Sequence, residues 1–378
     1  MNISILGAGN IGSAMAAIIS KHKENRIIVY TSRPQQWNEK IKYGDMTSDE
    51  IKISGRIYTT DNIEEAIRDA DIVFITVPSF LRKDYISRIE KFISAGCIVI
   101  FVPGCGGIEF CCKKLLEKGC IVAGTDRVPC VSRIKEYGKE VRMEWKKSIR
   151  LATFKQKQTA KVCELVSEVL DLECVSLKNY LVVTLTPSNQ IMHPVRLYSM
   201  FKDATANSKY KSMIPFYKEW DENTSRNLLE CDRELQDICA SLKNINLEEV
   251  IPLSVHYESD TVEKMTQKIK SIKSFAKVES PMKMDKDGMY KIDLSSRYFQ
   301  EDFSYGLCNI KSIALICGIQ TDLIDDIILW YQKLSGKNYF GDGNWNGVDL
   351  RSTNIPQNYG IKSIEELNDF YGIERNIK

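Results

Sequence analysis

The first half of the chain alternates short apolar runs with segments whose apolar residues recur every three or four positions. Residues 2–9 (NISILGAG) form an apolar run that ends in glycines, and residues 11–22 have helical periodicity. Residues 26–34 form a second apolar run, which stops at Pro34. This order predicts a βαβ unit at the start of the chain.

Further candidates for buried strands follow this unit, with helical segments between them. We expect strands at residues 71–78, 97–104, 120–124, 148–154 and 173–179, and helices at residues 62–70 and 107–119. Strands that alternate with helices in this way predict an α/β fold, in which a doubly wound parallel sheet is covered by helices on both faces.

The pattern changes near residue 180, after which helical periodicity dominates. We expect helices at residues 186–201, 225–242, 260–277, 305–318 and 322–336, and a polar loop with a glycine turn at residues 281–290. The sequence therefore predicts two domains, an α/β Rossmann domain at 1–180 and a mostly α-helical domain at 181–378. A cleft between them is the expected place for a substrate to meet a bound nucleotide.

Composition narrows the class of protein. The 378 residues are 43% hydrophobic and 27% charged, with a formal net charge of +2, which argues against a strongly basic surface for nucleic acid. The 12 cysteines are scattered and form no CxxC pair, so we expect reduced thiols and a cytoplasmic location. No apolar run approaches the ~18 to 20 residues of a membrane-spanning helix, so no membrane partner is expected.

A GxGxxG pattern lies where the first strand meets the first helix. Gly7 permits a tight turn, Gly9 lets a pyrophosphate approach the backbone, and Gly12 lets helix and strand pack closely. Asn10 and Ile11 complete this loop at the helix N-terminus. The pattern predicts a dinucleotide site, and a purely structural glycine turn is the alternative.

The end of the second strand bears on the choice of dinucleotide. NAD-binding units usually carry an acidic residue there for the ribose hydroxyls, whereas this chain has Thr31, Ser32 and Arg33. A guanidinium suits the 2′-phosphate of NADP, so we expect NADP (NADPH) to be favoured over NAD, with a solvated surface arginine as the alternative. Val77 and Pro78, at the end of the third main strand, complete the expected cofactor-binding set.

Histidine is scarce, since the chain has three. His22 lies between lysines, and His256 has no evident partner motif. His193 lies in the early turns of the helix expected after Pro187, so it would face the predicted cleft. A histidine exchanges protons near neutral pH, but a lone histidine is also often structural.

Four segments together resemble the NAD(P)-dependent octopine/nopaline-type opine dehydrogenases. They are GAGNIG at residues 7–12, DRVPCVSRIKEYGKEV at 126–141, TPSNQIMHPVRLY at 186–198 and the long segment from 296 to 332. The resemblance implies an enzyme that condenses the amino group of an amino acid or another amine with a 2-oxo acid and reduces the product to an N-(carboxyalkyl) amino acid. It also implies that His193 is catalytic.

The resemblance further implies a carboxylate partner for that histidine in the downstream ED motif. Asp302 is the first candidate and Glu301 the second. Such a carboxylate holds the second ring nitrogen and orients the imidazole. A helix N-cap for the following helical segment is an alternative role for Asp302.

Substrate carboxylates need cationic or polar partners. Arg297 resembles the arginine with which the family holds a substrate carboxylate, and Arg196 and Arg133 are weaker candidates. Asn189 is a candidate for orienting substrate or nicotinamide, with helix capping as the alternative. Cys130 corresponds by resemblance to a position near the substrate, with a buried core thiol as the alternative.

Two other functions share the predicted fold. One is a two-domain reductase of a 2-oxo or 2-hydroxy acid alone, similar to ketopantoate reductase or glycerol-phosphate dehydrogenase, and the other is a non-enzymatic NADP-sensing protein. The expected partners are a small 2-oxo acid and an amino acid, no metal is expected, and a homodimer is left open.

Overall fold

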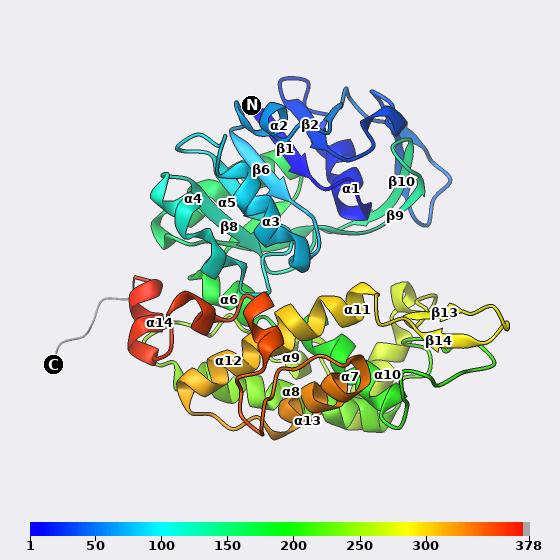
Figure 1. Ribbon diagram of the computed structural model, residues 1–378. Helices are drawn as coiled ribbons and strands as arrows, with labels where there is room; N and C mark the ends of the chain where they lie inside the picture. The colour runs from blue at the N-terminus through cyan, green and yellow to red at the C-terminus, as the bar shows by residue number, and fades with distance from the viewer. Residues whose placement is uncertain (373–378) are drawn as a thin grey trace. The chain divides into compact units, whose positions relative to one another are not determined.

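The computed structural model describes residues 1–372 and divides into two compact units (Figure 1). The first unit is Met1–Thr184, and the second begins at Leu185. The junction predicted after residue 180 falls at the start of helix α6 (Tyr180–Leu185).

The first unit is built on an eight-stranded sheet in the order β12-β11-β8-β7-β6-β1-β2-β5. Its strands are β1 (Asn2–Leu6), β2 (Arg26–Tyr30), β5 (Tyr58–Thr60), β6 (Ile72–Ile75), β7 (Ile98–Phe101), β8 (Ile121–Thr125), β11 (Ser148–Thr153) and β12 (Glu173–Ser176). The strands β1, β2, β6, β7 and β8 are rich in Ile and Val and are almost wholly buried, as the sequence predicts for a sheet covered on both faces, whereas the outer strands β5 and β12 are partly exposed. The α/β fold with its parallel nucleotide-binding sheet is thereby confirmed.

One pair in this sheet departs from the predicted parallel arrangement. Strands β8 and β11 are antiparallel, with Leu151 opposite Thr125. The chain between them forms a hairpin of β9 (Cys130–Glu136) and β10 (Glu140–Trp145), in which Cys130 pairs with Trp145. Because the hairpin returns the chain to the edge of the sheet that it left, β11 starts where β8 ends and runs in the opposite direction.

The helices of the first unit form two groups around the sheet. Helix α1 (Asn10–Ile19) packs with α5 (Thr159–Leu170), whereas α2 (Ile63–Ile67) and α3 (Ser79–Ile89) pack together with the turn that precedes α4 (Lys113–Glu117). The helix predicted at residues 107–119 begins as a 3-10 turn, Ile108–Cys112, before α4.

A second sheet of four strands, in the order β4-β3-β10-β9, has no counterpart among the predicted strands. It adds β3 (Lys42–Asp45) and β4 (Lys52–Ile53) to the β9–β10 hairpin. Helix α1 packs against β9 and β10 as well as β1, and its residues from Gly12 to Ile19 are all buried. The helix that follows the glycine loop is therefore held between two sheets.

The second unit is mostly helical, as predicted. Its helices are α7 (Asn189–Phe201), α8 (Glu222–Ser241), α9 (Leu253–His256), α10 (Val262–Ser271), α11 (Arg297–Gln300), α12 (Cys308–Cys317), α13 (Asp322–Ser335) and α14 (Ile364–Phe370). A π-helical turn, Asp302–Leu307, directly precedes α12. Within the described residues, no helix is both long enough and apolar enough to cross a membrane.

The prediction of a loop at residues 281–290 is wrong. The segment forms a two-stranded antiparallel hairpin of β13 (Met282–Met284) and β14 (Tyr290–Ile292), drawn in yellow in Figure 1. Its polar residues lie in the turn, where Gly288 has a φ of 75° and Asp285 accepts hydrogen bonds from turn amides. The polar and glycine residues of the turn therefore led to a loop prediction for a segment that also contains two short strands.

Candidate functional site

The glycine loop has the geometry that the sequence predicts for a dinucleotide turn. Gly7 has a φ of 120°, and its carbonyl accepts a hydrogen bond of 3.0 Å from the hydroxyl of Thr76 at the end of β6. A Cβ at Gly12 would overlap the Gly7 carbonyl, so close packing of α1 requires glycine there. Among residues 1–372, nothing lies within 4 Å of a Cβ at Gly9, the N-cap of α1, and no side chain caps the helix. These features fit an anion approaching the N-terminus of α1.

The other two loop residues are tied to the fold. The Oδ1 atom of Asn10 accepts a hydrogen bond of 2.8 Å from the Ile134 amide in β9, and Ile11 packs half-buried against the core. The Asn10 side chain thus joins the glycine loop to the second sheet. Val77 and Pro78 flank the loop at the end of β6, where Val77 lies 3.0 Å from the position of a Gly7 Cβ and Pro78 precedes α3.

The predicted NADP-selecting residues meet a tyrosine that the sequence did not single out. Thr31 Oγ1 lies 2.6 Å from the hydroxyl of Tyr137, which sits in the turn between β9 and β10. The Arg33 guanidinium carbon lies 3.9 Å from the centre of the Tyr137 ring, while Arg33 and Ser32 are exposed. Tyr137 thereby orders the arginine at the end of β2 by a cation–π contact.

Cys130 and Arg133 lie on β9 in different environments. Cys130 is fully buried in the core of the first unit, and burial raises the pKa of its thiol to about 11. Arg133 is exposed, and one of its guanidinium nitrogens donates to the Ser132 carbonyl at 2.9 Å. This environment favours the packing interpretation of Cys130 over the substrate-binding one.

In the second unit, α7 and the π-helical turn bring together two residues far apart in the sequence. Nδ1 of His193, in the second turn of α7, lies 2.8 Å from Oδ2 of Asp302. The two side chains are 11% and 14% exposed. Burial raises the pKa of Asp302, and attraction to the adjacent imidazole opposes that rise. Asp302 makes no N-cap hydrogen bond, so the capping role is not observed.

Close packing sets the distance between these two residues. A Cβ at Gly306, in the π-helical turn, would lie 2.6 Å from the Gln190 Cβ in α7. Glycine at this position therefore lets the turn that carries Asp302 approach the helix that carries His193.

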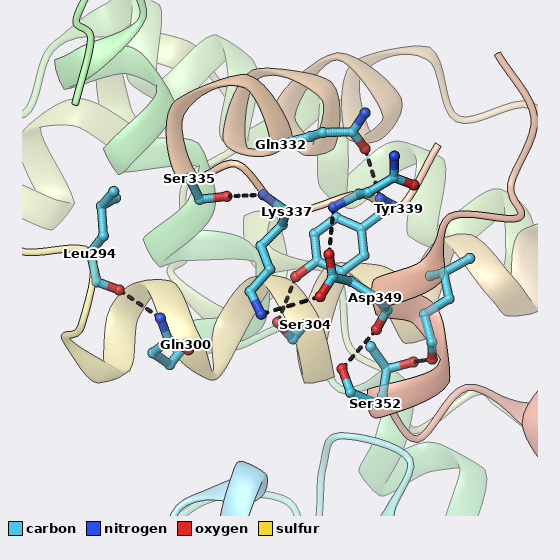
Figure 2. Close-up of polar contacts among 12 residues, drawn as sticks. Leu294, Gln300, Ser304, Gln332, Ser335, Lys337, Tyr339, Asp349 and Ser352 are labelled. Carbon is cyan, nitrogen blue, oxygen red and sulfur yellow. Dashed lines mark hydrogen bonds and ion pairs between the residues drawn. The ribbon is translucent and has the colours of Figure 1, made fainter. Parts of the chain in front are cut away.

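A polar network braces the other side of the π-helical turn (Figure 2). The Ser304 hydroxyl lies 2.7 Å from that of Tyr339, and Gln332 in α13 accepts hydrogen bonds from the Tyr339 and Phe340 amides. Asp349 accepts from the Asn338 amide at 2.7 Å. The network anchors the turn to α13 and to the chain that follows it.

Three aromatic residues surround His193, and sequence analysis missed all of them. Nε2 of His193 lies 3.1 Å from the Tyr217 hydroxyl, the Tyr298 ring centre lies 4.3 Å from the imidazole centre, and Phe216 makes an edge contact. Phe216 and Tyr217 belong to the segment PFYKEW at residues 215–220, whose aromatic density in a non-periodic stretch was an available signal.

Arg196, a weaker candidate for substrate binding in the sequence, is buried and makes hydrogen bonds within the second unit. It is 3% exposed, and its Nε donates a hydrogen bond of 2.6 Å to the Phe216 carbonyl. Its other nitrogens lie 3.5 Å from the Thr224 hydroxyl and the Pro215 carbonyl. Burial lowers the pKa of Arg196 to about 10. The structure therefore favours a structural role, in which Arg196 anchors the segment that carries Tyr217.

Arg297 and Asn189 lie at helix starts in the second unit. Arg297 begins α11, is 68% exposed, and pairs with Glu301 at 3.2 Å between Nε and Oε2. Glu301, the second candidate partner of His193, thus contacts Arg297 instead. Asn189 is the exposed first residue of α7, where Ser188 occupies the N-cap position.

The two units match different protein families. Residues 176–335 match the model of the NAD/NADP octopine/nopaline dehydrogenase alpha-helical domain, and residues 2–119 match that of the NAD-dependent glycerol-3-phosphate dehydrogenase N-terminus. Tauropine dehydrogenase of Arabella iricolor is 27% identical over 97% of this chain and 99% of its own length. Octopine dehydrogenase of Pecten maximus is 24% identical over 97% and 98%.

In its helical domain the chain matches the octopine/nopaline dehydrogenase family, and the relatives named tauropine and octopine dehydrogenase match it over 97% of its length. It is an NAD(P)-dependent oxidoreductase of the class that acts on CH–NH groups. A solved structure of octopine dehydrogenase with NADH and L-arginine has the same fold, with a TM-score of 0.85, 21% identity and full coverage of both chains.

The extent of the two family matches bears on the functions considered from sequence. The match to the glycerol-3-phosphate dehydrogenase model ends at residue 119, within the nucleotide-binding unit. The matched helical domain, in contrast, contains both His193 and Asp302. The helical domain is therefore similar to that of the opine dehydrogenases.

Proposed function

We propose that the protein catalyses the NADPH-dependent reductive condensation of a 2-oxo acid with the amino group of an amino acid or another amine, and the reverse oxidation. The product is an N-(carboxyalkyl) amino acid. The observation that carries this proposal is the His193–Asp302 pair in the helical domain that matches the opine dehydrogenases. The relatives named tauropine and octopine dehydrogenase support it.

The proposal assigns one task to each unit. The first unit, 1–180 in the sequence-based division, binds the cofactor, which supplies hydride when bound. The residues that would hold it are Gly7, Gly9 and Gly12 with the N-terminus of α1. The second unit, 181–378, carries the groups that handle substrate and protons.

We assign the preference for NADPH to Arg33. Its guanidinium is exposed, ordered on the Tyr137 ring, and lies at the end of β2 where an acidic residue would favour NAD. Thr31 lies beside it and accepts a hydrogen bond of 3.2 Å from the Arg33 amide. A planar cation in this position suits a phosphate group.

His193 is assigned proton transfer, because condensation of an amine with a carbonyl removes a proton from the amine and later adds one to the leaving hydroxyl. Asp302 holds Nδ1–H, which fixes the tautomer and stabilises the imidazolium as it forms. Arg297 is assigned to a substrate carboxylate, since its guanidinium is exposed and lies five residues before Asp302.

The proposed function is tested by identifying the reaction product. The protein is incubated with NADPH, pyruvate and a mixture of amino acids, and the mixture is examined by mass spectrometry. An N-(carboxyethyl) amino acid is expected. Formation of lactate with no such adduct would instead support the reductase of an oxo acid alone.

The remaining expectations are part of the same proposal. The partners are small molecules, and the scattered cysteines support a reducing, cytoplasmic location. A homodimer stays a prediction that light scattering can check.

A further inference from the structure

Both ring nitrogens of His193 are engaged by neighbouring side chains. Nδ1 lies 2.8 Å from Asp302, and Nε2 lies 3.1 Å from the Tyr217 hydroxyl. A carboxylate can accept only from N–H, so Nδ1 carries the proton in the neutral ring and Nε2 accepts from the Tyr217 O–H. A proton can therefore move between Nε2 and a substrate in two ways. Either it is transferred through the phenol oxygen, or the phenol must first leave Nε2.

We propose that Tyr217 is a proton-relay residue, whose hydroxyl passes protons between the substrate and Nε2 of His193. This inference rests on the proposed function. It adds Tyr217 to His193 as a side chain that contacts the reacting atoms.

Tyr217 is held firmly in the position that this role requires. Its ring is 4% exposed and stacks on Phe275 with centres 4.1 Å apart and an interplanar angle of 16°. The preceding residue, Phe216, has its carbonyl fixed by the buried Arg196 at 2.6 Å. Arg196 follows His193 by three residues on α7, so the same helix positions the imidazole and the segment that carries the phenol.

The chemical state of the phenol also suits a relay. Burial raises the pKa of Tyr217 well above its ordinary value, and the nearby Asp302 carboxylate raises it further. The hydroxyl therefore stays protonated, and it can donate to neutral Nε2 or accept from Nε2–H. A free phenolate is disfavoured, so the two proton transfers through the oxygen must occur together.

The relay runs twice in one condensation. First, the ammonium group of the amino acid gives a proton to the Tyr217 oxygen while the Tyr217 proton passes to Nε2, which leaves a free amine and an imidazolium. The amine attacks the carbonyl carbon, and one proton moves from its nitrogen to the oxygen, giving a carbinolamine.

In the second passage the imidazolium returns its proton to the Tyr217 oxygen while the phenol proton goes to the carbinolamine hydroxyl. The C–O bond breaks, water leaves, and an iminium with one N–H remains. The iminium carbon would then accept the hydride that bound NADPH supplies, which gives the secondary amine. His193 is then neutral again, and its Nδ1–H still donates a hydrogen bond to Asp302.

The test compares Tyr217→Phe with the parent enzyme under saturating NADPH, oxo acid and amino acid. The substitution removes one oxygen and keeps the ring that stacks on Phe275. We expect kcat to fall by about tenfold to a thousandfold, in line with the loss of one step of acid–base catalysis. The Kd of NADPH should stay within about twofold of the parent value, because the cofactor-binding loop belongs to the other unit.

Solvent isotope effects separate a relay from a merely structural role. In mixtures of H2O and D2O, the parent rate should depend on the deuterium fraction along a curve, because two protons move together. Tyr217→Phe should give a straight line. Tyr257→Phe is the matched control, since its hydroxyl meets Met192 Sδ at 3.8 Å, and it should keep the parent rate and curve.

The outcomes test the relay and the proposed function separately. A Tyr217→Phe enzyme with the parent kcat, or with a raised kcat, would overturn the relay and mean that the phenol only covers Nε2. A parent enzyme that shows no oxidation dependent on both substrates would instead overturn the proposed function. Reduced activity with an unchanged curved isotope dependence would also reject the relay.

Discussion

Nδ1 of His193 and Oδ2 of Asp302 lie 2.8 Å apart, although 109 positions separate the two residues in the chain. Two local elements create this relationship, the start of α7 and the π-helical turn before α12. Irregular π turns are frequent at functional sites. The same imidazole contacts the Tyr217 hydroxyl, so its orientation is fixed from both sides.

Removal of either member of the pair should therefore impair turnover more than cofactor binding. His193→Ala should lower kcat by about two to four decades and leave NADPH affinity nearly unchanged. Asp302→Asn should act in the same direction while the fold is kept, because the amide preserves the shape but loses the charge. Steady-state kinetics with cofactor titration checks both. Near-parental turnover in His193→Ala at saturating oxo acid and amine would make His193 structural.

The ordered arginine at the end of β2 predicts cofactor selectivity. Arg33→Ala should weaken NADPH binding by about one to two decades, since a charge-assisted pair contributes about 1.5 to 3 kcal/mol, and should change NADH binding little. Fluorescence titration with both cofactors measures the difference. Tyr137→Leu, which removes the ring beneath Arg33, should shift selectivity in the same direction by a smaller factor. Equal losses for the two cofactors would refute the assignment of Arg33.

The amino-acid sequence was sufficient to predict the parts of this molecule that follow from local periodicity. The βαβ start, the glycine loop and the helical second unit appear as predicted. The pairing of His193 with Asp302 came from a resemblance, because nothing in the local pattern links α7 to a turn about a hundred residues later.

Features that depend on long-range packing were missed for the same reason. Tyr137 reaches Thr31 and Arg33 only because the β9–β10 hairpin joins a second sheet. The strands of this sheet were not predicted, although β10 alternates apolar and charged residues along EVRMEW. Tyr217 lies outside any helix or strand, and the preceding residue, Phe216, is held through its carbonyl by Arg196. Arg196 is only a weaker candidate for substrate binding in the sequence, and its burial could not be foreseen because charge alone does not reveal burial.

Gly306 should control the geometry of the pair. Gly306→Ala would place a Cβ 2.6 Å from the Gln190 Cβ, so the π-helical turn must move away from α7. Overpacking of this kind costs about 1 to 3 kcal/mol, and a displacement near 1 Å can reduce catalysis by about a hundredfold. We expect a lower Tm and a lower kcat.

Gly318→Ala provides the control for lost stability. Gly318 is the C-cap of α12 with a φ of 69°, and in the described part of the chain no non-neighbouring atom lies within 4 Å of its Cβ position. Alanine there should lower stability by backbone strain, by about 1 kcal/mol, and should leave kcat unchanged. If both variants lose stability alike and both retain kcat, close approach at Gly306 is not needed for catalysis.

A buried carboxyl in α8 should make stability depend on pH. Burial raises the pKa of Asp232 to about 6, although it accepts a hydrogen bond from the Leu253 amide at 2.7 Å. In the unfolded chain the group ionises near its ordinary value of 3.8. The folded state thus binds the proton more tightly, so this contribution to stability is complete below about pH 4 and is lost as pH rises through about 6.

Asp232→Asn should remove that loss, since asparagine keeps an acceptor for the Leu253 amide without a charge. We expect the variant to exceed the parent by about 1 to 2 kcal/mol in the free energy of unfolding at pH 8. The advantage should shrink at pH 5. Thermal denaturation of both proteins at the two pH values measures this, and a variant that is less stable at pH 8 would show that the charged hydrogen bond outweighs the cost of burial.

The central claim is that hydride is delivered to an imine formed from two substrates. The most direct measurement follows NADPH absorbance with a panel of 2-oxo acids, each with and without a mixture of amino acids, and Arg297→Ala is run in parallel. Oxidation should be rapid only when an oxo acid and an amino acid are present together, and Arg297→Ala should raise the KM of one carboxylate substrate while NADPH binding is kept. Rapid oxidation with an oxo acid alone, giving the hydroxy acid, would contradict the claim.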